Sequence, residues 1–145
     1  MPKEIALHPP ALAAGVSAWC ALRVGSFRFS CRWNWIFGNK TSDHTCCACR
    51  CSNEDTDHLL WYCKAWKRHR RHFVASLALL VGESKWESLP MERKTLIALG
   101  GLSDLTSKVA LACGIASVHF LNRVSRIRDI FVANWGTRLR EAATA

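Results

Sequence analysis

Long apolar runs are absent from this chain. Beyond the N-terminal region, the longest are Phe73–Val81 and Val109–Phe120, both shorter than the roughly 20 residues that a helix needs to span a bilayer. Ile5–Leu22 is rather apolar, but His8 and two prolines interrupt it, and a positively charged start is nearly missing. These absences argue against a membrane partner and a secretory signal. We therefore expect an intracellular protein, nuclear or cytoplasmic.

Acidic residues are scarce. The 145 residues include 11 Asp and Glu against 20 Lys and Arg, which gives a net charge of +9. Such a surplus attracts polyanions, nucleic acid among them, although a solvated basic surface without a partner explains it equally well. Half of the residues are hydrophobic, so the chain can bury a real core, as one domain or two small ones.

The cysteines are crowded rather than spread along the chain. Five of the eight fall within residues 46–63, in a polar loop that also contains His58. A disulfide framework would usually be distributed over a secreted chain, so the crowding favours a metal site in a reducing compartment. Buried free thiols explain Cys20 and Cys113, but they explain the polar cluster poorly.

A four-ligand zinc pattern is present in this cluster. Zinc prefers four tetrahedral ligands drawn from thiolate sulfur and imidazole nitrogen. The spacing Cys-x2-Cys-x8-His-x4-Cys predicts Cys46, Cys49, His58 and Cys63 as ligands. Cys47 and Cys51 offer a rival first pair with the same His58 and Cys63, and His44 is also near. Because protein fills all four positions, we expect a structural ion, since a catalytic zinc keeps one position open.

Apolar spacing predicts a mainly α-helical fold, with a small Cys-Cys-His-Cys zinc knuckle leading into a helical bundle. The expected helices cover 11–24, His58 toward Val81, Pro90 through Leu99, and a longest helix from the cap Ser103-Asp104 through Trp135. Asp55–Asp57 supply N-cap residues for the second helix, and Gly82 supplies its C-cap. Alternating aromatic and polar residues from Phe27 to Trp35 predict a short strand or hairpin before the knuckle.

Three segments follow from these expectations. Residues 1–19 form a poorly ordered or short helical start, residues 20–82 form a zinc-binding module with a basic helix, and residues 83–145 form a C-terminal helical region. We expect the second basic group, on the last helix, to be solubilising, because it is spread around that helix. It comprises Arg123, Arg126, Arg128, Arg138 and Arg140.

A basic run follows the last predicted ligand directly. Its candidate phosphate-binding cations are Lys64, Lys67, Arg68, Arg70 and Arg71, with His69 and His72 among them. Cations on a helix that an ion holds in place can contact successive phosphates, and a solvated face is the alternative. Trp61, Tyr62 and Trp66 could stack on unpaired bases, but burial in the core is the commoner role for such rings.

Residues 20–72 resemble the zinc-binding segment at the C-terminal end of non-LTR retrotransposon reverse transcriptases. The matching elements are Leu22-Arg23-Val24-Gly25, Cys46-Cys-Ala-Cys49, and the acidic-Thr-x-His-Leu-Leu-x-x-Cys stretch from Glu54 to Cys63 followed by Trp66 and Arg68. Downstream, Leu121-Asn122-Arg123 is similar to the helical, Arg-rich end of that family. The chain departs from the family in the doubled Cys46-Cys47 and in Cys51, which leaves the ligand register open.

The resemblance implies the four ligands Cys46, Cys49, His58 and Cys63, and a role in holding RNA or DNA near a polymerase. The polymerase itself is missing, because its paired aspartates have no counterpart: the five aspartates here are never adjacent. We expect a non-catalytic, zinc-binding fragment that binds nucleic acid and has no small-molecule substrate. The alternative is a zinc-stabilised domain that docks a protein partner through its amphipathic C-terminal helix.

Overall fold

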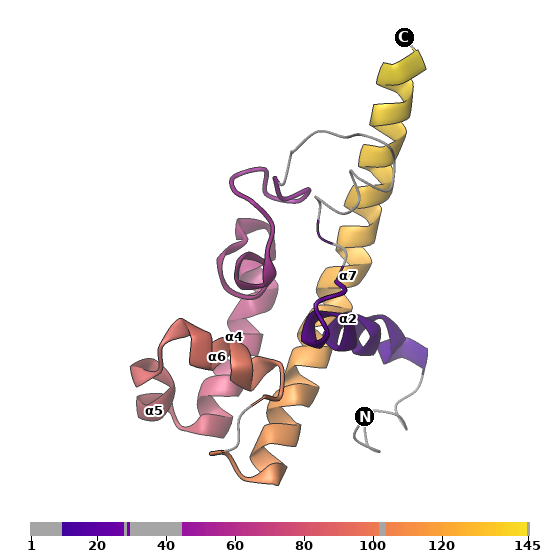
Figure 1. Cartoon of the computed structure of the whole chain (residues 1–145). Helices are drawn as coiled ribbons and strands as arrows, with labels where there is room; N and C mark the ends of the chain where they lie inside the picture. The colour runs from indigo at the N-terminus through magenta and orange to yellow at the C-terminus, as the bar shows by residue number, and fades with distance from the viewer. Residues whose placement is uncertain (1–9, 28, 30–44, 102–103, 145) are drawn as a thin grey trace.

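The computed structural model describes residues 10–27, 29, 45–101 and 104–144, without the side chains of Pro10 and residues 131–143. It is mainly helical, as the sequence predicts (Figure 1). The elements are η1 (Pro10–Leu12), α2 (Ala13–Arg23), η2 (His58–Tyr62), η3 (Lys64–Trp66), α4 (Lys67–Val81), α5 (Glu83–Ser88), α6 (Met91–Ala98) and α7 (Ser107–Thr144). Within the described residues, β pairing is limited to one isolated antiparallel bridge, Thr45 with Asn53.

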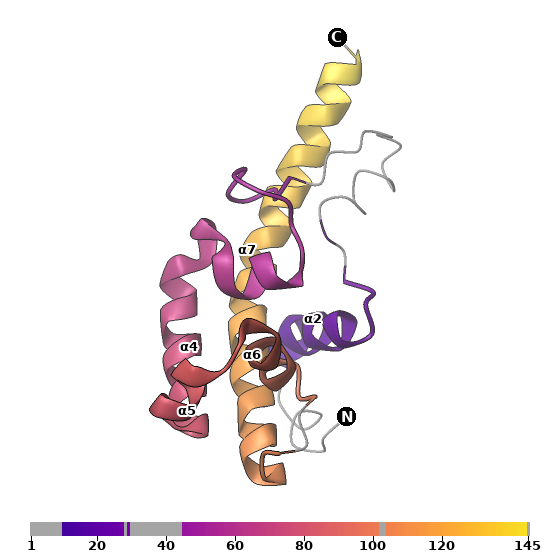
Figure 2. The ribbon, with the colours of Figure 1, turned by 60° about the vertical axis from the view of Figure 1, so that its left-hand side comes forward.

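Helix α7 is the axis of the molecule. Its 38 residues make it about 57 Å long at a rise of about 1.5 Å per residue. Helices α2, α4 and α6 pack against it, and Figure 2 shows α4 and α2 on opposite sides of it. The described helices contain no segment that is both long and apolar enough to cross a membrane.

The crossing of α2 over α7 depends on a glycine. A Cβ added at Gly15 would lie 2.3 Å from the carbonyl oxygen of Val118, so only glycine allows the two backbones to approach this closely. The Gly15 amide donates to Asn122 Oδ1 at 3.1 Å, and Asn122 Nδ2 donates to the Ala11 carbonyl at 3.0 Å. Buried polar groups are thus paired across the crossing, as their burial requires.

Aromatic side chains join α4 to α7 and to the short helices. The rings of Phe73 and Phe120 stack at a centroid distance of 4.5 Å, and Trp61 stacks on Phe73 at 5.7 Å. Trp66 is 1% exposed and Trp61 is partly buried against the core, so the predicted core role of these rings is confirmed for both. It is wrong for Tyr62, which is 57% exposed.

The helix predicted from His58 to Val81 is interrupted. Cys63 has extended backbone angles, φ −60° and ψ 121°, and it separates the single wide turn η2 from η3 and α4. The interruption turns the backbone at Cys63, which is one of the four predicted metal ligands. The predicted C-cap is confirmed, because Gly82 has φ 102° and its amide donates to the Ala78 carbonyl.

The remaining helix predictions differ from the structure mainly at their ends. Helices α2 and α6 lie within the predicted ranges, and α5 has no counterpart among the predictions. The cap of α7 is Thr106, whose hydroxyl accepts from the Val109 amide at 3.3 Å, rather than Ser103-Asp104. The predicted strand over 27–35 lies almost wholly outside the described residues. The three predicted segments remain a division of the sequence, and residues from all three contribute to one core.

Candidate metal centre and basic surface

A tight loop presents the first two cysteines. Residues 45–53, here called the cysteine loop, are closed by the Thr45–Asn53 bridge and by a hydrogen bond of 2.8 Å from the Cys46 amide to the Ser52 carbonyl. The Arg50 amide donates to the Cys46 carbonyl at 3.1 Å, and Arg50 itself has φ 59°, in the left-handed region. The turn therefore folds the chain back on itself between the Cys-x-x-Cys pair and the following histidine.

The second two donors come from the turn that follows. The Asp55 carboxylate caps this turn by accepting from the His58 amide at 2.7 Å, which confirms the predicted N-cap. The Cys63 amide donates to the His58 carbonyl at 2.7 Å, five residues back, so the turn is wider than an α-helical one. This wide turn brings His58 and Cys63 to the same side, facing the cysteine loop.

Four donor atoms converge between these two segments. The sulfurs of Cys46 and Cys63 are 3.8 Å apart, and Cys49 Sγ is 3.3 Å from His58 Nε2. All four donor atoms lie within 4.8 Å of one another. We call Cys46, Cys49, His58 and Cys63 the Cys3His cluster.

These separations suit a tetrahedral ion. With metal–sulfur bonds of about 2.3 Å, two sulfurs at the tetrahedral angle stand about 3.8 Å apart, and a sulfur and an imidazole nitrogen stand about 3.6 Å apart. The observed 3.8 Å and 3.3 Å agree with these values. Ser52 Oγ lies 2.9 Å from His58 Nδ1, and this contact directs Nε2 toward the cluster, as the outer partner of a ligating histidine does.

The structure separates the predicted ligands from their rivals. Among the described residues, the one group able to hold a metal is the Cys3His cluster, which is the register that the sequence favours. Cys51 is exposed, and its thiol donates to the Cys49 carbonyl at 3.1 Å. Cys47 is buried, and its sulfur lies 3.9 Å from Glu54 Oε2 and is not among the four converging donors. His44 lies outside the described residues.

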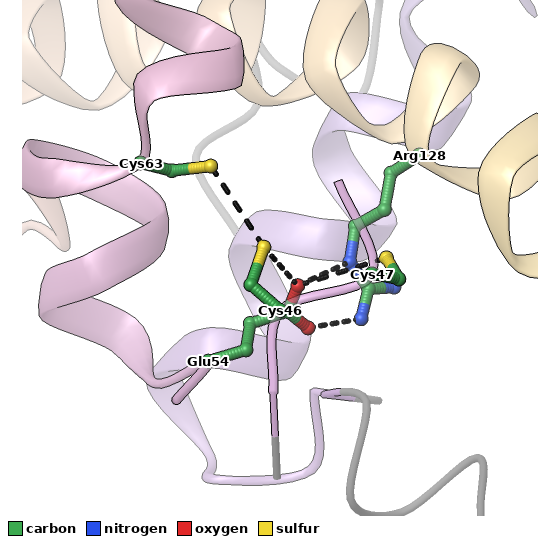
Figure 3. A network of polar contacts seen from close by, with 5 residues as sticks. All are labelled: Cys46, Cys47, Glu54, Cys63 and Arg128. Atoms are coloured by element: carbon green, nitrogen blue, oxygen red, sulfur yellow. Dashed lines mark hydrogen bonds and ion pairs between the residues drawn. The ribbon is translucent and has the colours of Figure 1, made fainter. Parts of the chain in front are cut away.

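A buried ion pair lies directly behind the cluster (Figure 3). Glu54 and Arg128 are 5% and 3% exposed, and the Arg128 guanidinium donates to both oxygens of the Glu54 carboxylate. Cys46 Sγ is 3.4 Å from the same carboxylate. The pair thus connects a cluster ligand to α7, and it matches the two-pronged geometry that arginine offers a carboxylate.

The solubilising role predicted for Arg128 is therefore wrong, and Glu54 was not predicted as a structural residue. A signal for both was available in the sequence. Arg128 follows Leu121 and Val124 at the spacing of the buried stripe, where a charge must find a partner. Glu54 follows the last of the four cysteines of the loop by three residues.

The pKa values of the Cys46 and Cys63 thiols are shifted in opposite directions. Hydrogen bonds from Cys47 and Cys63 lower the pKa of Cys46 below its ordinary value, and the hydrogen bond to Cys46, together with burial, raises the pKa of Cys63. Burial also raises the pKa of the Glu54 carboxyl, against the opposing effect of Arg128. An ion entering the cluster would displace the remaining thiol protons, since thiolates are the ligating form.

The Arg70 side chain forms hydrogen bonds with the backbone around the interruption of the helix. Its Nε donates to the Leu60 carbonyl and its Nη2 to the Cys63 carbonyl, both at 2.8 Å. Both carbonyls lie at the interruption of the helix, where the Cys63 carbonyl also accepts from the Trp66 amide at 3.3 Å. Arg70 therefore has a structural role that the sequence did not predict, and it differs in this from the other candidate cations.

The other four candidate cations are exposed. They lie along η3 and α4, with Lys67 and Arg68 adjacent and each three or four residues from Lys64 and Arg71. We call the four the basic face: Lys64, Lys67, Arg68 and Arg71. No acidic residue occurs between Asp57 and Glu83. The positive charge of the basic face is thus not neutralised from within its own helix.

Comparison of the chain with protein-family models, with curated proteins and with solved structures finds no match. The function must therefore be inferred from the residues of the chain itself.

Proposed function

We propose that this chain is a zinc-stabilised module that binds nucleic acid and has no catalytic activity of its own. The ion is zinc because three thiolates and one imidazole at tetrahedral separations are its typical structural donor set. The filled donor set supports a structural role, since no position is left for water or substrate. Free thiols throughout the described part of the chain fit a reducing, intracellular compartment.

The observation that carries the nucleic-acid proposal is the basic face. Its four cations lie in η3 and in the first turns of α4, which follow directly from the cluster ligand Cys63. An ion in the cluster would fix this helix relative to α7, so that the cations keep a defined spacing. Cations at helical spacing neutralise successive phosphates and release counterions, which supplies most of the affinity of non-specific binding.

The resemblance to the C-terminal region of non-LTR retrotransposon reverse transcriptases supports the same proposal. We propose that the chain derives from such a region and acts as its nucleic-acid-holding part, whether the strand is RNA or DNA. Binding a polynucleotide in this way requires no catalytic carboxylates.

Docking of a protein partner through the amphipathic C-terminal helix is less favoured. In the described part of α7, the apolar stripe already faces the core, with Cys113, Val118, Leu121 and Val124 no more than 2% exposed. A stripe that is buried within the chain is not available to a partner. Docking of a protein partner is therefore the alternative that the following experiment distinguishes from nucleic-acid binding.

Binding of a fluorescein-labelled single-stranded oligonucleotide, measured by anisotropy over a range of salt concentrations, tests the proposal. The variant Lys67→Gln with Arg71→Gln removes two cations of the basic face. Its matched control, Arg93→Gln with Lys108→Gln, removes two exposed cations elsewhere. We expect the wild type to bind with a steep salt dependence, and the first variant to lower the slope of log K against log salt by about 1.4.

The control variant should keep the wild-type slope. An equal decrease of the slope in both variants would mean that the protein attracts the oligonucleotide by its overall charge and not through the basic face. If the wild-type protein does not bind the oligonucleotide at low salt, the proposal is contradicted and protein docking is favoured.

A further inference from the structure

A groove lies between α4 and α7. Its volume is about 220 Å³. Helix α4 contributes His69, His72 and Ser76 to its walls, and α7 contributes Ala116, His119 and Arg123. The groove therefore gathers three imidazoles and one guanidinium from two elements that are about fifty residues apart in the sequence.

The floor of the groove is apolar and already packed. It consists of Phe73 and Phe120, whose rings lie nearly parallel, at 6°, and are 3% and 4% exposed. Because each ring face is used in holding the two helices together, neither is free to stack on a base. The floor fixes the depth of the groove, and any recognition must come from the polar walls.

The walls suit an anion. Arg123 carries a permanent charge, and each imidazole can donate a hydrogen bond. No acidic residue lines the groove, none occurs in α4, and none occurs in α7 before Asp129. The Ser76 hydroxyl donates to the His72 carbonyl at 2.9 Å, so it is not a donor for a ligand. An anion in the groove would thus meet donors on both walls and no competing carboxylate.

The size of the groove limits what it can hold. Pockets for drug-sized ligands usually enclose about 300–1,000 Å³, so about 220 Å³ is room for a phosphate group and little beyond its sugar. The three imidazoles do not form a second metal centre, because the Cys3His cluster is the one metal-competent group in the described part of the chain.

We propose that this groove binds a phosphate group, and that in the bound state the phosphate belongs to the nucleic-acid strand that follows the basic face. The inference rests on the proposed function. His72 follows Arg68 by four residues in α4, so the two side chains are neighbours on the helix surface and the groove borders the basic face. Arg123 and His119 extend this basic surface onto α7, and the strand would cross from one helix to the other.

Two variants test the groove without touching the basic face. Ala116→Leu fills the groove and leaves the charge unchanged, whereas Arg123→Gln removes its permanent charge and leaves the packing unchanged. Lys108→Gln is the control, since it removes an exposed charge from the same helix about 22 Å away from Arg123. Thermal unfolding and zinc content of each variant verify that it is folded.

With the zinc-loaded full chain and the labelled single-stranded oligonucleotide, we expect both groove variants to weaken binding by roughly fivefold. Lys108→Gln should bind as the wild type does. If both groove variants keep wild-type affinity while Lys67→Gln with Arg71→Gln loses it, the groove proposal is overturned and the proposed function stands. If the wild type does not bind the oligonucleotide, the proposed function fails instead.

A second measurement separates a strand phosphate from a free one. Inorganic phosphate is titrated into the protein while the imidazole proton resonances of the three groove histidines are followed by NMR. Saturable shifts that disappear in Ala116→Leu support a phosphate site in the groove. Such shifts without any effect of the groove variants on the oligonucleotide would assign the site to free phosphate and overturn its place in strand binding. Shifts in neither wild type nor variant, with unchanged oligonucleotide binding, would overturn the proposal entirely.

Discussion

The cysteine loop and the α2–α7 crossing are held together by opposite means. At the crossing, a glycine lets two helices touch, and the contact buries apolar side chains such as Trp19 and Leu22 at 3% and 6% exposure. Within the cysteine loop only Cys46 and Cys47 are buried. The loop is joined to the turn that follows it by the four converging donors, and beside it lie the capped turn and one buried ion pair.

This difference between the two regions indicates which of them requires a bound ion to fold. Apolar burial stabilises the crossing without help, at about 25 cal/mol per Å² of apolar surface removed from water. The loop is a short polar segment, and such segments seldom fold unless a metal or a disulfide closes them. We therefore expect the two regions to respond separately to mutation, and the following predictions measure that separation in order of decreasing effect.

Removal of a cluster ligand should have the largest effect. Cys63→Ser leaves three donors, so we expect the protein to lose its zinc, and with it much of the binding free energy of about 10–16 kcal/mol that structural zinc sites show. The cysteine loop should then unfold while α2, α6 and α7 stay helical. Zinc content, circular dichroism and amide hydrogen exchange check this prediction.

Cys51→Ser is the matched control for Cys63→Ser, since Cys51 is exposed and outside the cluster. It should keep the zinc and the stability of the wild type. Loss of zinc in Cys51→Ser, with retention in Cys63→Ser, would mean that a different set of cysteines binds the ion.

Breaking the buried ion pair should come next. Glu54→Gln leaves the Arg128 guanidinium buried without a countercharge, which typically costs about 3–5 kcal/mol. Replacing both partners, as Glu54→Gln with Arg128→Met, should recover most of that loss, because no buried charge remains. Arg123→Met changes an exposed arginine of the same helix and should alter stability by no more than about 0.5 kcal/mol.

Urea unfolding of these three variants gives the free energies directly. Zinc affinity should fall with Glu54→Gln as well, because the carboxylate contacts Cys46. An equal stability loss in the single and the double variant would show that the pair is not coupled.

The crossing should be sensitive in a different way. Gly15→Ala places a Cβ 2.3 Å from the Val118 carbonyl oxygen, so α2 must move away from α7. We expect a loss of about 1–3 kcal/mol in the free energy of unfolding, with the zinc content unchanged. Ala14→Gly, one residue earlier and only half-buried, is a control for helix propensity and should cost about 1 kcal/mol or less. Loss of zinc in Gly15→Ala would mean that the two regions are not separable.

The smallest effect should come from Arg50. A non-glycine residue at φ 59° costs about 1–2 kcal/mol relative to its preferred regions, and glycine is free of that cost but loses more entropy on folding. Arg50→Gly should therefore leave stability unchanged or raise it by up to about 1 kcal/mol. Arg50→Val should lower it, because a β-branched residue fits this region poorly. A stabilising Arg50→Val would mean that the turn differs from the one described.

What the sequence predicted correctly is local. The apolar periodicity of α7, the spacing of the cluster donors, the Asp55 cap and the Gly82 C-cap all depend on residues within a few turns of one another. Such patterns are set by the geometry of a single helix or loop, which a sequence contains in full.

What the sequence did not predict depends on contacts between distant segments. Glu54 and Arg128 are 74 residues apart, and their pairing follows from where α7 lies relative to the cysteine loop. The extended backbone of Cys63 opposes the helical preference of the residues around it and is held by Arg70. Tertiary contacts overrode local propensity at this position, as they do where a site is built.

X-ray absorption at the zinc K-edge of the purified full chain tests the central claim most directly. We expect one zinc per chain, with three sulfur neighbours at about 2.3 Å and one nitrogen neighbour at about 2.0–2.1 Å. A zinc shell of oxygen and nitrogen alone, or a folded protein that contains no zinc after metal-replete purification, would contradict it.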